Sequence, residues 1–394
     1  MKKRRVFFLF GLILFFSLLS NVSSLLLVNH TAVDDFDAGN IPSYWIDQVK
    51  QSNMVIHLPG QSHAQQFTGD KDGEPPNSCL LPEGYGGLEQ LEILYPEYSV
   101  QVDCSLSNLN EANALHVVKG QYTGSSWGGA WECRYGDEEY WSREAGRVIT
   151  ENTFAQAINQ GKPIDYSTWG WSYDIINDLA SIDEDGNIIT FNDERMDAYF
   201  NAFVRFNTNP SFPDTIVYYM TAITDEPIYN DPNYVGYKGW RVTKYNQDIR
   251  NEAIANDGIL FDQADIENWN EDNTEQRIDT WDDGGTIRTL YLMHEDFDIS
   301  ECGHVSNELT VKKAKAVWWM AARLAGWNGD PSHTGPTQKS LDVNSDGLIN
   351  TIDLALITYW QGTLTSIGDF HNHLDLNSDG IINWNDVTEV LSTI

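Results

Sequence analysis

Positive charge is scarce in this chain. Its 394 residues include 24 Lys and Arg against 58 Asp and Glu, for a formal net charge of −34. Such an acidic surface repels phosphate backbones and anionic membranes, so nucleic acid is disfavoured as a partner, whereas neutral sugars, metal ions and basic proteins are compatible. Aromatic residues make up 12% of the chain, far more than in a disordered acidic tail. The composition therefore indicates a globular protein with a sizeable core.

Long apolar runs are missing beyond the first thirty residues. The chain opens with MKKRR, continues with VFFLFGLILFFSLL and then reaches SNVSS. This order is typical of a secretory signal, so we expect residues 1–24 to be a signal peptide cleaved near Ser24 and the protein to be secreted or extracellular, with attachment to a cell surface as an option. An uncleaved anchor is the alternative, because LLLV at 25–28 could lengthen a run shorter than the roughly 18 residues of a membrane span. After cleavage no stable membrane insertion is expected.

Cysteines are few and lack the CxxC spacing of zinc sites. In a secreted chain an even number of cysteines predicts one or two disulfides. Sequence spacing leaves all three full pairings open. The four residues are Cys79, Cys104, Cys133 and Cys302.

An internal repeat occupies the C-terminal end. LDVNSDGLINTIDL at 341–354 and LDLNSDGIINWNDV at 374–387 have their first aspartates 33 positions apart. Each copy has oxygen-bearing side chains at loop positions 1, 3, 5, 9 and 12, a glycine at position 6 and a main-chain carbonyl at position 7, which is the ligand pattern of a calcium loop. The predicted calcium ligands are Asp342, Asn344, Asp346, Leu348, Asn350 and Asp353 in the first copy and Asp375, Asn377, Asp379, Ile381, Asn383 and Asp386 in the second.

Aspartate at position 12 and the single helix after each loop make residues 341–394 resemble a type I dockerin module. The resemblance implies a small all-α domain of two EF-hand-like loops that binds two Ca²⁺ ions. It also implies a partner, a cohesin on a scaffold or cell-surface protein, usually in polysaccharide-degrading systems. In dockerins, loop positions 10 and 11 help to select the cohesin; here they are Thr351 and Ile352 in one copy and Trp384 and Asn385 in the other. The two copies are therefore not expected to be interchangeable, and the Thr351/Ile352 face is favoured.

A polar segment separates this module from the rest of the chain. Residues 328–340, NGDPSHTGPTQKS, are short and rich in Gly, Pro and Ser, which is typical of a linker. No comparable stretch interrupts residues 29–327. We therefore expect one large domain at 29–327, a linker at 328–340 and the dockerin domain at 341–394.

The large domain alternates strand-like and helix-like segments. Apolar runs predict buried strands, and helical periodicity recurs between them. The predicted strands are 54–58, 215–220 and 258–266, and the predicted helices are 193–206, 241–256 and 309–327. This order predicts an α/β fold, a three-layer sandwich around a mainly parallel sheet. Active sites of such sheets lie at the carboxyl ends of the strands.

Candidate catalytic residues follow this rule. Ser62 and His63 come after the strand at 54–58, on a glycine-containing turn of the kind that presents a nucleophilic serine. Near the end of the domain, Glu301 precedes His304 by three residues. A serine early and an acid-x-x-His pair late is the order of one convergent hydrolase arrangement, in which His304 is the general base and Glu301 orients it.

A family resemblance adds to this reading. The domain resembles a group of secreted bacterial proteins of uncharacterised function related to SGNH/GDSL hydrolases, over most of residues 50–327. The segments that carry the resemblance are HLPGQSHAQQF (57–67), STWGWSYD (167–174), VYYMTAITDE (217–226), YNQDIRNEAIANDGILFDQADIENW (245–269) and GHVSNELTVKKAKAVWWMAARLAGW (303–327). It implies an SGNH-like three-layer sandwich, with Ser62 as the block-one serine and Glu301 with His304 as the terminal pair.

The sequence departs from the SGNH pattern in three places. The serine lies in GQS rather than GDS, the terminal acid is Glu rather than Asp, and no GxND segment supplies the usual oxyanion asparagine. Trp169, Gly170 and Trp171 occupy its place in the order. Either their backbone amides stabilise an oxyanion or the chemistry is altered or lost.

Three functions are compatible with these patterns. The first is a serine esterase that acts on acyl substituents of polysaccharide. The second is a glycoside hydrolase that uses paired carboxylates among Asp262, Asp265 and Glu267. The third is a non-catalytic carbohydrate-binding or surface protein whose Trp and Tyr side chains stack on sugars. The second and third functions each have a purely structural alternative. The three acids would then cap a helix or hold a loop, and most of the 14 Trp would belong to the core.

Overall fold

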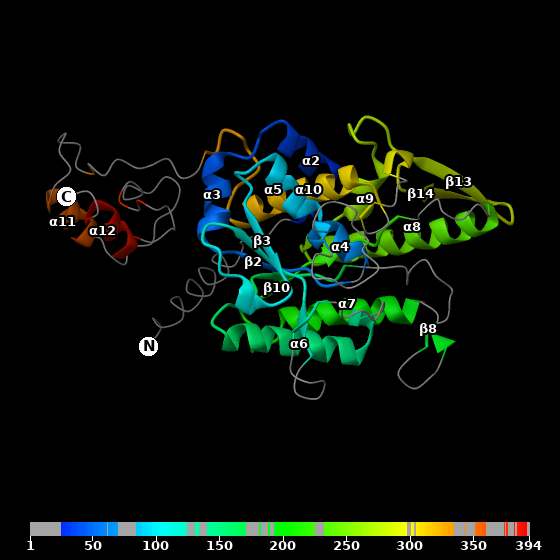
Figure 1. The fold of residues 1–394 in the computed structure, drawn as a ribbon, viewed down its shortest axis with the longest axis horizontal. Helices are drawn as coiled ribbons and strands as arrows, with labels where there is room; N and C mark the ends of the chain where they lie inside the picture. Colours follow the sequence, from blue (N-terminus) through cyan, green and yellow to red (C-terminus); the bar gives the residue numbers. More distant parts are fainter. Residues whose placement is uncertain are drawn as a thin grey trace, which may run out of the picture. The chain divides into compact units, whose positions relative to one another are not determined.

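The chain divides into two compact units in the computed structural model (Figure 1). One unit contains the residues up to Ala38 together with Val49–Met320, and the other contains Gly39–Gln48 together with Ala321–Ile394. The structure describes residues 25–60, 62–69, 84–123, 131–133, 140–170, 181–182, 188–189, 193–224, 232–297, 301–302, 305–334, 343, 351–359, 374, 376, 382 and 384–391.

Two parallel sheets, joined edge to edge by one stretch of chain, form the centre of the first unit. One has five strands in the order β10-β7-β2-β4-β3 and the other has three in the order β1-β12-β11, and every pairing in both is parallel. The strands are β1 (Leu26–Val28), β2 (Val55–His57), β3 (Val100–Asp103), β4 (Leu115–Val118), β7 (Tyr166–Ser167), β10 (Ile216–Val217), β11 (Tyr219–Met220) and β12 (Ile259–Phe261). Only Tyr218 separates β10 from β11, so one extended stretch pairs with β7 through its first half and with β12 through its second half. This arrangement confirms the predicted α/β class with parallel strands.

Helices cover both faces of the sheet. The helices of this unit are α2 (His30–Asp37), α4 (Ser62–Thr68), α5 (Gly87–Leu94), α6 (Glu144–Asn159), α7 (Asp193–Asn207), α8 (Pro232–Ala255), α9 (Gln263–Asn268) and α10 (Asn307–Leu324), and α3 (Ser43–Gln51) crosses between the units. Leu260 of β12 joins a core cluster with α6, α7 and α8. The next residue, Phe261, points to the other face and packs against Phe67 of α4, as the alternation of a strand requires. Figure 1 shows α6 and α7 on one side of the strands and α5 and α10 on the other.

Smaller elements decorate this framework. In the described part of the chain, antiparallel pairs join β5 (Gln121–Tyr122) with β6 (Trp131–Glu132), β8 (Ser181–Ile182) with β9 (Ile188–Ile189), and β13 (Ile278–Asp283) with β14 (Thr286–Tyr291), the last as a hairpin. Short 3₁₀ helices are η2 (Leu106–Asn108), η4 (Tyr140–Ser142) and η6 (Glu295–Phe297). The longest hairpin packs on α8, where a Cβ at Gly236 would lie 2.2 Å from the Trp281 ring. Glycine at this position therefore lets the hairpin approach the helix.

Disulfides are present, as the cysteine count predicts. Cys104 and Cys133 are bonded, with their Cα atoms 4.9 Å apart. Cys302 is disulfide-bonded as well, to a partner outside the described residues.

The observed elements differ from the predicted ones in two instructive places. The predicted strand 258–266 ends at Phe261, because the Asp262 side chain accepts the backbone N–H of Asp265 and starts α9. Residues 26–28, which could have lengthened an apolar leader, instead form β1 and pair with 259–261. Within the described part of the chain, no helix is both long enough and apolar enough to cross a membrane.

The second unit ends in two helices, α11 (Thr351–Tyr359) and α12 (Trp384–Leu391), which pack together. Their core consists of Val343, Ile357, Leu374, Leu376, Ile382, Val387 and Val390. Val343 with Leu376, and Ile357 with Val390, are pairs 33 positions apart, so equivalent residues of the two repeats fill equivalent places in one core.

Candidate active site at the carboxyl edge of the sheet

The turn after β2 leads directly into the helix that begins at Ser62. Gly60 has φ +153° and forms a parallel bridge with Gly170, which follows β7. A Cβ at Gly60 would lie 2.8 Å from the Cβ of Ala64 and 2.9 Å from the Gly170 carbonyl oxygen. Two strand ends therefore meet here without room for a side chain. The Ser62 side chain itself lies outside the description.

The Gly170 amide is already engaged. Its N–H donates to the Pro59 carbonyl over 3.1 Å, and the neighbouring Trp169 side chain is buried. The expectation that backbone amides of residues 169–171 stabilise an oxyanion is therefore wrong for Gly170, whose N–H is used to join the two turns. Trp171 lies outside the described residues.

Glu301 contributes to the start of α10. Its Oε2 accepts the backbone N–H of Asn307 over 3.0 Å, and its own N–H donates to the Val305 carbonyl. Since the first N–H groups of a helix have no partner within the helix, this carboxylate satisfies one of them. His304 lies outside the described residues, so the role of Glu301 in orienting its imidazole stays a prediction.

Cys302, the residue after Glu301, contacts α4. The Cys302 Sγ lies 3.5 Å from the carbonyl oxygen of Gln65, although the two residues are 237 positions apart. Gln65 is three residues, about one helical turn, into the helix that begins at Ser62. The fold thus brings Cys302, the neighbour of Glu301, to the helix that begins at Ser62.

The three acids proposed for a glycosidase each have a fixed cationic or imidazole partner. Asp262 forms a two-pronged ion pair with Arg250. The Oδ2 of Asp265 lies 2.5 Å from the Nδ1 of His30, whose ring stacks on Trp269. Asp262 and Asp265 therefore hold the end of β12 and the start of α9 in place. This agrees with the structural role that was the alternative to catalysis.

The third acid, Glu267, forms a buried ion pair with Lys313. Its Oε1 accepts from the Lys313 ammonium over 2.5 Å, and its Oε2 accepts from the backbone N–H and the hydroxyl of Thr224 over 2.6 and 2.8 Å. Burial lowers the pKa of Lys313, and the charge of Glu267 opposes that shift. Sequence analysis missed Lys313; its signal was a group of lysines at 312, 313 and 315 directly before the apolar run of the same helix.

His57 ends β2 inside the domain. Its Nδ1 lies 2.8 Å from the Ser167 Oγ of the neighbouring strand, and its ring meets Phe154 edge to face. Burial lowers the pKa of His57 to about 3. This imidazole is therefore neutral at physiological pH and joins two strands rather than exchanging protons.

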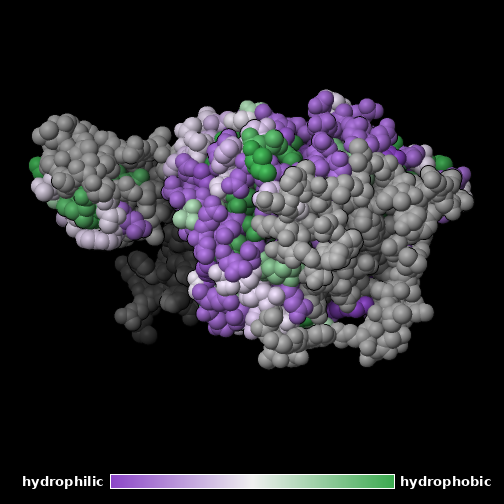
Figure 2. All heavy atoms as spheres, in the orientation of Figure 1, coloured by the Kyte–Doolittle hydropathy of each residue, from purple (hydrophilic) through white to green (hydrophobic). Residues whose placement is uncertain are grey.

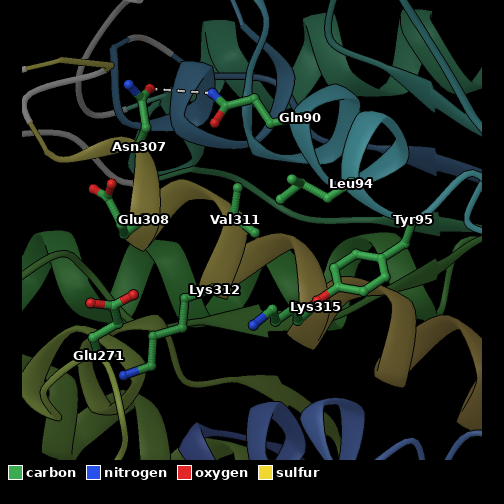
Figure 3. Close-up of a pocket in the computed structure, with 9 residues that line it drawn as sticks. All are labelled: Gln90, Leu94, Tyr95, Glu271, Asn307, Glu308, Val311, Lys312 and Lys315. Atoms are coloured by element: carbon green, nitrogen blue, oxygen red, sulfur yellow. Dashed lines mark hydrogen bonds between the residues drawn. The ribbon is translucent and has the colours of Figure 1, made fainter.

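A pocket of about 300 Å³ lies between α5 and α10 (Figure 3). Figure 3 shows α10 forming its floor, α5 along one side and Glu271 on the other. Its lining comprises Gln90, Leu94, Tyr95, Glu271, Asn307, Glu308, Val311, Lys312 and Lys315. Asn307 is the residue whose N–H is bound by Glu301, so the rim of the pocket adjoins the 301–305 turn.

The pocket combines apolar and polar surface. Figure 2 shows hydrophobic residues gathered over α5, where Leu94, which lines the pocket, is 61% exposed. On the floor, Lys312 donates to the carbonyls of Trp269 and Asn270, and burial lowers the pKa of its ammonium to about 8. Such a surface suits a ligand with both apolar and hydroxyl groups.

Several tryptophans lie in the interior. Among the described residues the buried ones are Trp45, Trp141, Trp169, Trp318, Trp319 and Trp327. These six belong to the core and are not available for stacking on sugars.

In the second unit, Asp353 is the predicted calcium ligand whose side chain is described. It lies in the first turn of α11 and is fully buried. A buried carboxylate at the end of an oxygen-rich loop fits a hard cation such as Ca²⁺. The predicted ligands Asp342, Asn344, Asp346, Leu348, Asn350, Asp375, Asn377, Asp379, Ile381 and Asn383, and the side chain of Asp386, lie outside the description. The residues at loop positions 10 and 11 face solvent in both copies, with Ile352 55% and Trp384 57% exposed.

Comparison with known proteins supports this assignment. The family model of the dockerin type I domain matches residues 340–394. Domains of this type bind Ca²⁺ through EF-hand-like loops, so calcium is the cofactor of this region, and a dockerin implies a cohesin as partner. Neither the curated proteins nor the solved structures give a match to the chain.

Proposed function

We propose that this protein is a secreted hydrolase of the serine esterase type, with an SGNH-like three-layer α/β domain at 29–327, which its dockerin domain anchors to a cohesin on a scaffold or cell surface. In this proposal Ser62 is the nucleophile, His304 the general base and Glu301 the group that orients it. The contact of Cys302 with Gln65 carries the proposal, because it joins the segment that contains Glu301 and His304 to the helix that begins at Ser62.

The proposed reaction is acyl transfer. The Ser62 hydroxyl attacks the acyl carbonyl as His304 takes its proton. The bond between the acyl carbon and the sugar oxygen then breaks, and the imidazolium gives that proton to the departing oxygen, which leaves as the sugar hydroxyl. Water then releases the acid from Ser62 by the same steps in reverse. Acyl groups on polysaccharide suit the mixed lining of the pocket beside the 301–305 turn, and an uncharged polymer suits a chain with a net charge of −34.

The geometry favours this reaction over glycoside hydrolysis. A glycosidase needs two carboxyl groups that face one substrate across an open cleft. Asp262, Asp265 and Glu267 are instead held by Arg250, His30 and Lys313. The esterase proposal needs none of these three acids.

Acetate release from acetylated xylan tests the proposal. We expect Ser62→Ala to lower the rate about 10³-fold or more, because the nucleophile is lost, while the fold is retained. Ser52→Ala, in an exposed turn after α3, is the matched control and should retain the rate. Equal rates for the wild type and Ser62→Ala would refute Ser62 as nucleophile.

For the dockerin, we propose that the Thr351/Ile352 face contacts the cohesin. Titration calorimetry against a panel of type I cohesins in calcium should show binding by the wild type and by Trp384→Ala, and its loss in Ile352→Asp. Loss in Trp384→Ala alone would assign the contact to the other copy.

A further inference from the structure

A lysine with no exposure to solvent lies between three helices of the large domain. The side chains of Lys313 on α10 and Glu267 on α9 are 0% and 1% exposed. The Lys313 ammonium also donates to the Oε1 of Gln66 on α4 and lies 3.4 Å from the Oε1 of Gln263. A buried ion pair seldom repays its desolvation by stability alone, which raises the question of what this one positions.

The hydrogen bonds from Lys313 have a fixed direction. An ammonium group can only donate, so the amide atom of Gln66 that faces it is the oxygen. The NH₂ group of Gln66 then faces the Nδ1 of His63, 3.1 Å away. Since an amide NH₂ can only donate, Nδ1 accepts and bears no proton. The proton of His63 is therefore on Nε2, and the imidazole is neutral.

The other end of this chain of bonds is fixed as well. Glu267 receives two hydrogen bonds from Thr224, and Gln263 donates through its NH₂ to the Thr221 carbonyl over 2.6 Å. Both threonines follow β11, at the carboxyl edge of the sheet. The loop after β11 thus orients Glu267 and Gln263, while the ammonium of Lys313 sets the direction of the bonds from Gln66 to His63.

We propose that Glu267, Lys313 and Gln66 are positioning residues that hold His63 as a neutral imidazole with its proton on Nε2, one residue after Ser62. In this tautomer the buried Nε2 carries the proton, so it can donate a hydrogen bond to an oxygen atom but cannot take up a proton. The role of general base is then left to His304. The tautomer follows from the hydrogen bonds alone, whereas its value for catalysis rests on the proposed function.

Nitrogen NMR of the full-length protein labelled with ¹⁵N-histidine tests the tautomer directly, with His63→Gln to identify the signals among the nine histidines. We expect an unprotonated Nδ1 and a protonated Nε2, unchanged between pH 5 and 8, the range in which an ordinary imidazole titrates. A proton on Nδ1, or a cationic His63 imidazole between pH 5 and 8, would overturn the proposal.

Substitution of Gln66 tests the cause. In Gln66→Glu a carboxylate, which only accepts, faces Nδ1, so we expect the proton to move to Nδ1 or the ring to become cationic. Gln66→Met removes the donor, and we expect His63 to titrate between pH 5 and 8. Gln90→Met, a buried glutamine on α5 outside this chain of bonds, is the matched control and should leave the His63 signals unchanged.

Each variant is accepted only if its circular dichroism and thermal transition show a folded domain. If Gln66→Glu does not fold, the wild-type spectrum and the spectrum of Gln66→Met decide whether Gln66 sets the tautomer of His63. A His63 that keeps the Nε2 proton in both folded variants would refute the positioning role. The expected tautomer in a protein without esterase activity would refute the proposed function and leave this inference intact.

Discussion

The guanidinium of Arg250 donates two hydrogen bonds to the carboxylate of Asp262, 2.6 and 2.8 Å long. Arg250 lies on α8, and Asp262 starts α9 directly after β12. The hydroxyl of Thr221 donates to the same carboxylate from the end of β11. One acid therefore connects two strand ends and two helices at the edge where the candidate site lies.

We expect Arg250→Met to lower the free energy of unfolding of the large domain by about 3 to 5 kcal/mol, because the buried Asp262 carboxylate would lose its partner. Lys244→Met is the matched control on the same helix: its ion pair with Asp248 is well exposed, so a loss of at most about 1 kcal/mol is expected. Urea denaturation measures both values. Equal losses in the two variants would contradict the structural role of Asp262.

Gly60→Ala should disturb the turn before Ser62. Its φ of +153° disfavours a side chain, and the added Cβ would collide with Ala64 and Gly170. Gly161→Ala is the control, since Gly161 also has a positive φ, +70°, but open space around it. We expect about 1 kcal/mol of destabilisation at Gly161 and clearly more at Gly60, together with a loss of esterase rate only at Gly60. Thermal unfolding and acetate release give the two readouts.

His57 should make the large domain less stable as the pH falls. Its pKa of about 3 in the folded domain lies below the ordinary 6.5 of the unfolded chain, so only the unfolded chain takes up a proton between these values. The resulting loss is about 2 kcal/mol between pH 7 and pH 5. His57→Gln cannot titrate and should lack this part of the pH dependence. Parallel pH profiles for the two proteins would contradict the lowered pKa of His57.

Asp353→Ala should weaken one of two calcium sites. The full chain is expected to bind two Ca²⁺ ions, one per repeat, and loss of the buried position-12 carboxylate should lower the affinity of one site by more than about tenfold. Thr358→Ala, on the exposed side of the same helix, is the control. Titration calorimetry after removal of bound calcium counts the sites. Unchanged binding in Asp353→Ala would remove this residue from the ligand set.

Residues 54–58 and 215–220 form β2 and the β10–β11 stretch as predicted, because they are short and largely apolar runs. The central strands β4 and β7 and the edge strands β1 and β3 were not predicted. For the edge strands there is a physical reason. β3 carries its polar residues on its half-exposed side, and β1 lies in an apolar segment that reads as the end of a leader. Only pairing with β4 or β12 reveals them as strands.

Ser62, Glu301 and His304 stay a prediction from their order in the chain, whereas the dockerin match confirms the calcium-binding region. The contacts between distant segments could not be predicted. The bonds of Lys313 to Glu267 and Gln66 join residues 46 and 247 positions apart. No local pattern encodes such distances, since they follow from the packing of α10 against α4 and α9.

The pairing of β1 with β12 has a consequence for the timing of folding. It joins residues 26–28 to residues 259–261, so the outer edge of the sheet cannot close until nearly the whole domain has been synthesised. A chain that must cross a membrane before it folds benefits from such a delay. Strand β1, which lies next to the proposed leader, would then be among the last strands to pair, after the leader has directed export.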